Sequence, residues 1–151
     1  MFSMMRVALV VFAGVTLAAC AASTALEPQN QPPSSRTARI YILRPTAFSG
    51  AAHPGTVKIN GAEVGSAGAN SYLFVDRPPG RYKIETAIFN GLEHEVDVEA
   101  GRTYYFAINI LHSRSNIGRP LGKPTLLTPG WLAEVDASEA TATMARMRPP
   151  K

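Results

Sequence analysis

Residues 92–99 read LEHEVDVE, and the pattern of this stretch indicates the fold class. Leucine, histidine and valines alternate with acidic residues, so every second side chain can face a core while the others face water. An amphipathic helix would instead repeat its apolar residues every three to four positions. The pattern is typical of a half-buried strand in an antiparallel sheet.

The same alternation continues on both sides of this stretch. Residues 104–110 (YYFAINI) and 82–88 (YKIETAI) repeat it at similar length. Shorter runs that are bounded by Pro, Gly, Asn or Asp occupy residues 39–44, 57–64, 71–76 and 131–135. The sequence therefore predicts an all-β fold, a small antiparallel β-sandwich of seven or eight strands. An open barrel fits the same pattern.

One hairpin turn can be placed by matching side chains across the two strands that it joins. A two-residue type I′ turn at residues 60–61 (Asn-Gly) sets Val57 opposite Val64 and Lys58 opposite Glu63, so both pairs match in character. We expect this register.

The next hairpin is predicted by the same matching. A three-residue loop over residues 89–91 (FNG) sets Ile84 opposite Val96 and Lys83 opposite Asp97. A two-residue turn would set Ile84 opposite Asp97 and mix the two faces. We therefore expect the three-residue loop.

A short helix is expected after the last strand. Asp136 can act as its N-cap, with Glu139 three residues later as in a capping box. Pro149 would end the helix. Its apolar stripe would consist of Ala140, Met144 and Met147.

Composition limits the classes of protein that the chain can belong to. The chain has 151 residues, of which 46% are hydrophobic and 17% charged, and this length suits one folded domain. A single cysteine excludes a disulfide within the chain. The net charge is only +4, without a run of Lys and Arg, so we expect no nucleic-acid partner.

The N-terminus resembles a secretory leader. Arg6 is the only charged residue before Glu27, and residues 7–18 form an almost wholly apolar stretch of the length of a signal-peptide core. Residues 17–20 (LAAC) resemble the lipobox of bacterial lipoproteins, in which the cysteine is lipidated and the leader is cut just before it. Cys20 is therefore the predicted lipidation site. The alternative is an ordinary signal peptide in which Cys20 stands by chance.

This interpretation divides the chain into a leader (1–19), a flexible tether (20–37) and a β-sandwich domain with its helix (38–151). Residues 21–37 are rich in Pro, Gln, Ser and Asn and have no hydrophobic period, a composition typical of an extended, mobile segment. We expect the tether to hold the domain away from the membrane. By resemblance to lipoproteins, Ala21 implies sorting to the outer membrane, facing the periplasm, in a Gram-negative host.

Two short segments come near to known catalytic motifs, but neither has the residue spacing that its motif requires. Residues 64–68 (VGSAG) come nearest to a nucleophile elbow but lack its spacing. His94 and Glu95 begin like a zinc-protease motif, but Val98 stands where the second histidine is required. We therefore predict no enzyme, with a hydrolase as the least favoured function.

Metal ligands are also scattered. The three histidines (His53, His94 and His112) lie far apart in sequence, and we predict no metal and no cofactor. His94 is expected to pack on the apolar face of its strand. The acidic residues of 92–99 could suggest a cation site, but pairing with Arg81 and Lys83 and exposure to solvent explain them.

The segment 112–123 is long, basic and contains glycine. One hypothesis is that Arg114, Arg119 and Lys123 form a candidate anion-binding loop, for a phosphate-bearing glycan or an acidic protein surface. We favour the alternative, a solvated, mobile loop without a ligand.

Four segments together resemble a known family: residues 38–45 (ARIYILRP), 57–65 (VKINGAEVG), 78–82 (PPGRY) and 99–105 (EAGRTYY). Their order and spacing resemble the bacterial lipoprotein family called domain of unknown function 2846, over residues 38 to about 136. The central hairpin also resembles the PEGA module of surface-associated bacterial proteins. The resemblance implies a secreted, lipid-anchored β-domain. It implies no catalytic residues.

Two functional hypotheses follow. The first is a lipid-anchored cell-envelope protein, bound to the membrane through Cys20, whose domain is a binding or structural module for an envelope protein or an anionic glycan. The alternative is a secreted, soluble ligand-binding domain that holds an anionic partner at the 112–123 loop.

Overall fold

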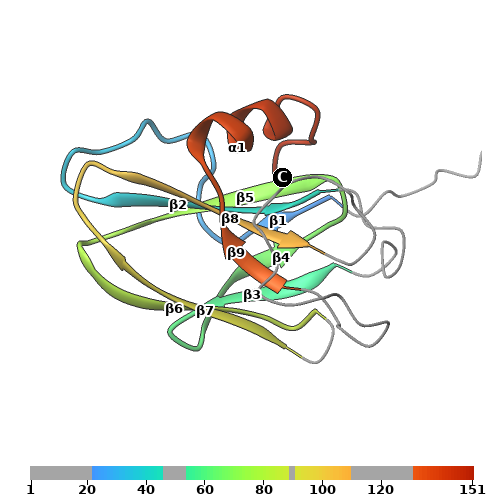
Figure 1. Ribbon diagram of the computed structural model, residues 1–151, viewed down its shortest axis with the longest axis horizontal. Helices are drawn as coiled ribbons and strands as arrows, with labels where there is room; N and C mark the ends of the chain where they lie inside the picture. The colour runs from blue at the N-terminus through green and yellow to red at the C-terminus, as the bar shows by residue number, and fades with distance from the viewer. Residues whose placement is uncertain (1–21, 46–53, 89–90, 110–130) are drawn as a thin grey trace, which may run out of the picture.

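The computed structural model describes residues 22–45, 54–88, 91–109 and 131–151 (Figure 1). Within these residues the chain forms nine strands and one helix. Their bounds are β1 (Thr24–Ala25), β2 (Ala38–Arg44), β3 (Gly55–Ile59), β4 (Ala62–Ala67), β5 (Ser71–Arg77), β6 (Gly80–Thr86), β7 (Leu92–Val98), β8 (Thr103–Asn109), β9 (Trp131–Glu134) and α1 (Ala137–Met144).

The strands form two sheets that pack face to face. The five-stranded sheet has the order β1-β4-β3-β6-β7, and the four-stranded sheet has the order β5-β2-β8-β9. The side chains between them form the main core, which includes Ile40, Ile42, Val57, Leu73, Val75, Ile84, Phe106 and Ile108. The predicted all-β sandwich with one short C-terminal helix is confirmed.

One pair of neighbouring strands is parallel, whereas the sequence predicted only antiparallel pairs. β2 pairs with β5 in the antiparallel sense but with β8 in the parallel sense, so that Ile42 lies opposite Phe106. The four-stranded sheet is therefore mixed. Alternation of side chains defines the two faces of a strand, but it is the same for either direction of a neighbour.

The first predicted hairpin is correct beside its turn and wrong beyond it. Asn60 and Gly61 both have positive φ (49° and 78°), as a type I′ turn requires, and Lys58 pairs with Glu63. A bulge then sets Val57 opposite Gly65 rather than Val64.

Gly65 has a structural role in this bulge. Its φ is +151°, and a Cβ built on it would lie 2.2 Å from the carbonyl oxygen of Thr24. A glycine here lets β1 approach β4, where Ala25 lies opposite Gly65. The bulge thus coincides with the place where the N-terminal strand joins the sheet.

The second predicted hairpin is wrong by two residues. Thr86 lies opposite Leu92 and Lys83 opposite Glu95, so the loop spans residues 87–91 instead of 89–91. The end of β6 stops pairing with β7 at Thr86, because the chain then turns toward β3. There the N–H of Ala87 donates to the carbonyl of Thr56 (2.9 Å). A shift of two residues leaves every side chain on its predicted face.

The helix α1 packs on the outer face of the four-stranded sheet (Figure 1). Ala140 and Met147 are buried there against Leu43, which confirms the predicted packing. Asp136 is the N-cap, but its side chain makes no capping hydrogen bond, and the helix ends at Met144 rather than at Pro149. The predicted capping box and helix end are therefore wrong.

The expected tether is wrong over residues 22–37, because this segment is bonded to the domain. Ser23 is fully buried, and β1 adds a strand to the edge of the five-stranded sheet. The polar side chains that suggested a mobile segment instead form hydrogen bonds and an ion pair with β5. Residues 20–21 lie outside the described ranges.

Candidate functional site

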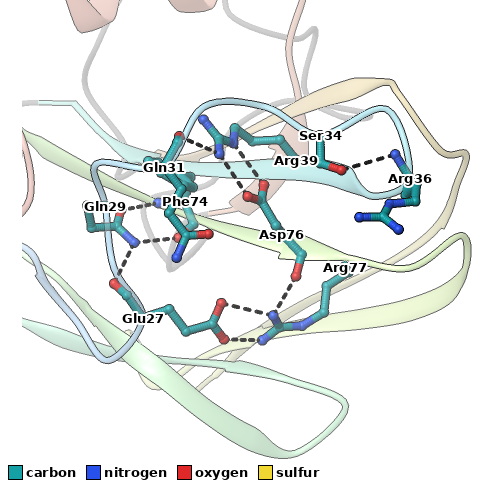
Figure 2. A network of polar contacts seen from close by, with 9 residues as sticks. All are labelled: Glu27, Gln29, Gln31, Ser34, Arg36, Arg39, Phe74, Asp76 and Arg77. Atoms are coloured by element: carbon teal, nitrogen blue, oxygen red, sulfur yellow. Dashed lines mark hydrogen bonds and ion pairs between the residues drawn. The ribbon is translucent and has the colours of Figure 1, made fainter.

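The N-terminal segment lies along the free edge of β5 (Figure 2). Gln29 bonds the Phe74 backbone twice: its Nε2 donates to the carbonyl and its Oε1 accepts from the N–H, both at 2.8 Å. Because an edge strand exposes unpaired backbone groups, this side chain replaces a neighbouring strand at Phe74. Farther along β5, Arg77 forms a two-pronged ion pair with Glu27, at 2.6 and 3.0 Å.

A buried ion pair lies next to this edge. Arg39 on β2 is only 5% exposed and stands directly opposite Asp76 on β5. Its Nε and Nη2 donate to the two carboxylate oxygens at 2.8 and 2.7 Å, and Nη2 also donates to the Gln31 carbonyl at 2.8 Å. The hydrogen bonds that Arg39 donates to the Asp76 carboxylate raise the pKa of Arg39, so the guanidinium stays charged.

Aromatic rings cover the sheet beside this ion pair. Tyr41 stacks on Tyr105 with centroids 5.2 Å apart, and its ring also lies 5.4 Å from Phe74 and 6.1 Å from Tyr72. The Arg39 guanidinium lies 3.8 Å above the Phe74 ring, a cation–π contact. Burial raises the pKa of Tyr72 and Tyr105, which keeps both phenols neutral over a wide pH range.

A pocket of about 410 Å³ lies between the aromatic face, the N-terminal segment and the C-terminal residues. We call it the aromatic pocket. Its lining consists of Gln29, Asn30, Gln31, Pro32, Arg39, Tyr41, Tyr72, Phe74, Pro149 and Pro150. The volume falls within the usual range for small-molecule sites.

The chemistry of the aromatic pocket favours a neutral ligand. Among the described residues that line it, the only cation is Arg39, which is already neutralised by Asp76. The rings and prolines offer flat apolar surfaces for stacking, while Asn30 at the rim offers an amide. These groups can bind and orient a ligand, and none of them is arranged as a nucleophile beside a base.

A serine pair occurs at another place and serves a structural role. The hydroxyls of Ser23 and Ser71 lie 2.8 Å apart, and both residues are fully buried. Ser71 Oγ donates to the Gly68 carbonyl, while Ser23 Oγ accepts from the Gly68 N–H. The two hydroxyls join the N-terminal segment to the β4–β5 connection.

Most residues that the sequence singled out lie outside the described ranges. These are Cys20, the proposed lipidation site, and Arg114, Arg119 and Lys123 of the candidate anion-binding loop. Within the described ranges, no helix is long and apolar enough to cross a bilayer.

His94 and the acidic strand residues are described. The His94 ring lies 5.1 Å from the Phe106 ring, on the core side of β7 as predicted. On the other side, Asp97 pairs with Arg81 at 3.5 Å, Glu93 with Lys83 at 3.5 Å and Glu99 with Arg102 at 3.0 Å. The described residues contain no group of three His, Cys, Asp or Glu able to hold a metal ion.

A family model described as "Protein of unknown function (DUF2846)" matches residues 34–119, more than half of the chain. The chain belongs to this family. The DUF2846 match includes β2 to β8 and so confirms the resemblance that the sequence indicated. No protein with curated annotation matches the chain.

The range that matches the DUF2846 model contains only some of the residues that line the aromatic pocket. Arg39, Tyr41, Tyr72 and Phe74 lie inside the matched range, whereas residues 29–32 and 149–150 lie outside it. The floor of the pocket thus belongs to the family region, and its rim is built by the flanking segments.

Sequence reasoning missed the aromatic pocket, although a signal was present. The outward residues of β2 and β5 include three aromatic side chains and a pair of opposite charges, where a solvent-facing strand would carry mostly small polar or charged residues. An apolar outward face predicts that something covers it. The segments that do so are far away in sequence.

Proposed function

We propose that this DUF2846 protein is a lipid-anchored cell-envelope protein whose β-sandwich acts as a binding module. The anchor is the lipid on Cys20. In a host with two membranes, the domain faces the periplasm from the outer membrane. The observation that carries the anchor is the LAAC sequence at residues 17–20, directly after an apolar stretch.

The binding part of the proposal is supported by the aromatic pocket. It combines stacking surfaces on Tyr41, Tyr72 and Phe74 with hydrogen-bonding groups at its rim. Its chemistry suits a neutral partner with flat apolar surfaces, for example a glycan face or a proline-rich segment. The anionic partner expected at the 112–123 loop remains a separate hypothesis.

The anchor is tested by Cys20→Ser in the native host. We expect the variant to lose incorporation of labelled palmitate, to keep its leader and to leave the membrane fraction. Ala22→Ser is the matched control, since it changes a neighbouring residue to serine and retains the thiol. Unchanged processing and membrane attachment of Cys20→Ser would contradict the proposal and favour a secreted, soluble domain.

The binding module is tested by photo-crosslinking in living cells. A photoreactive amino acid at Asn30, on the exposed rim of the aromatic pocket, should give a discrete crosslinked product. The same group at Glu63, which is exposed on the five-stranded sheet, is the control. A product that is equally strong from both positions, or that survives Tyr72→Ala, would argue against the pocket as the binding site.

A further inference from the structure

Ser23, the second described residue of the chain, is fixed in the domain. Ser23 is fully buried. Its N–H donates to the Ser71 hydroxyl at 2.8 Å, and its own hydroxyl bonds both Ser71 (2.8 Å) and the Gly68 N–H (3.1 Å). Three hydrogen bonds thus attach Ser23 to Gly68 in the β4–β5 connection and to Ser71 at the start of β5.

The next residues are held on two sides. On one side, β1 pairs with β4, and the glycine at position 65 allows the close approach of Thr24. On the other side lies the C-terminal residue: the Lys151 N–H donates to the Ser23 carbonyl (3.1 Å), and the Ala25 N–H donates to the Lys151 carbonyl (3.4 Å). Figure 1 shows the C-terminus close to β1.

Covalent geometry then limits the distance between the domain and a lipid on Cys20. Cys20 and Ser23 are three residues apart, so their Cα atoms are separated by at most about 11 Å. The headgroup layer of one leaflet is on the order of 5–8 Å thick. Even fully extended, this connection leaves Ser23 no more than about 6 Å beyond the headgroup layer when the acyl groups lie in the hydrocarbon, so the domain surface around Ser23 lies against the headgroups.

We infer that the sandwich rests directly on the membrane with one defined end. This inference rests on the proposed lipidation of Cys20. The contacting surface, which we call the anchor end, consists of residues 69–70 and 148–151, which lie next to the buried Ser23. Its partner is a phospholipid headgroup surface.

The charge and the geometry of the anchor end fit this partner. Arg148 brings positive charge to it; its backbone N–H donates to the Asn70 carbonyl and its Nη2 donates to the Ala69 carbonyl. Headgroup phosphates attract such side chains. The opposite end of the sandwich, where β5 ends at Arg77, lies about 20 Å away along the strand.

The test uses the full-length acylated protein, extracted from membranes and reconstituted into vesicles of phosphatidylethanolamine and phosphatidylglycerol. A fluorophore is attached to Ala69→Cys at the anchor end or, in the matched control, to Ser35→Cys at the exposed far end. Lipids with a quencher on their headgroups report proximity. We expect several-fold stronger quenching at position 69 than at position 35.

A second variant shows whether the short connection causes this difference. Twenty Gly and Ser residues inserted between Ala22 and Ser23 add a linker with a root-mean-square length of about 25 Å. We expect quenching at position 69 to fall to the level at position 35, with the fold unchanged by circular dichroism.

The outcomes separate the inference from the proposed function. An acylated, vesicle-bound protein with equal quenching at both positions would overturn the inference and leave the anchor standing. Strong quenching at position 69 that persists in the insertion variant would also overturn it. A protein that carries no acyl mass and does not bind the vesicles would contradict the proposed function, and the inference with it.

Discussion

The outer faces of the two sheets follow the same alternation of side chains but differ in what covers them. On the five-stranded sheet, β6 and β7 present charged residues that stay exposed and pair weakly with one another. On the four-stranded sheet, β2, β5 and β8 present aromatic residues and the Arg39–Asp76 pair, beneath α1, the C-terminal residues and the N-terminal segment. The character of the outward residues, rather than the period, distinguishes a solvated face from a covered one.

The largest expected difference between the two faces follows from the removal of Asp76. The variant Asp76→Ala leaves the Arg39 guanidinium buried without its carboxylate, because the Arg39 side chain is only 6% exposed. We expect the free energy of unfolding to fall by about 3 kcal/mol. Equilibrium denaturation in urea measures it.

The matched control for this change lies on the solvated face. Asp97→Ala removes the partner of Arg81, where both side chains are at least 70% exposed. Pairs of this kind contribute little to stability, so we expect a change close to the error of the measurement. Similar losses in the two variants would show that the faces do not differ as we describe.

A smaller effect is expected from Gln29→Ala. The variant removes both bonds to the Phe74 backbone and leaves an edge N–H and carbonyl without this partner. We expect a loss of about 1–2 kcal/mol and faster hydrogen exchange at the Phe74 amide. Gln31→Ala is the control, because Gln31 contacts Arg39 through its backbone carbonyl. Unchanged exchange at Phe74 would contradict the assignment of Gln29 as an edge cap.

The faces and the register of the strands could be predicted from the sequence only in part. Alternation identified the inward and outward sets in β6, β7 and β8, including His94 on the core side of β7. It could not fix the offset of β6 against β7, because a shift of two residues preserves both faces. The true offset depends on Ala87 and Ile88, which turn toward Thr56 and Gly55 on a third strand.

The prediction of a mobile tether for the N-terminal segment was the larger error, and it has a physical cause. Composition predicts that residues 22–37 lack enough apolar surface to form a core of their own, which is correct. It does not show that Gln29 and Glu27 can bind backbone and side-chain groups of a sheet edge 45 to 50 residues later. The aromatic pocket was missed for the same reason, since its rim is supplied by that segment.

The two faces should also differ in the cause of their pKa shifts. On the covered face, burial raises the pKa of Tyr72 and Tyr105 above the ordinary tyrosine value near 10. The folded state thus favours the neutral phenols, and this contribution to stability is present below pH 10 and is lost as the pH rises through the raised values. Ultraviolet titration of the phenolates, with Tyr72→Phe to assign one of them, should give pH midpoints above the ordinary tyrosine value. Midpoints at the ordinary value would show that solvent reaches this face.

The smallest expected effect is a pKa change on the solvated face. There the neighbouring Lys83 lowers the pKa of Glu85, whereas burial raises the pKa values on the covered face. Lys83 Nζ lies 3.0 Å from a Glu85 carboxylate oxygen and is the main cause of the lowered pKa of Glu85. In Lys83→Met we expect this pKa to rise, though not fully, because the Gly61 N–H still donates to Glu85 at 2.9 Å. Carboxyl NMR titration measures it, and Arg81→Met is the control.

The lowered pKa of Glu85 stabilises the fold above the ordinary carboxyl range, and this contribution is lost as the pH falls through the lowered value. Because the pair is exposed, 1 M salt, with a screening length of about 3 Å, should weaken it strongly. The same salt should leave the stability difference between wild type and Asp76→Ala nearly intact, since that pair is shielded from solvent. An Asp76→Ala effect as sensitive to salt as the Lys83→Met shift would mean that both faces are solvated alike, and the distinction between them would fail.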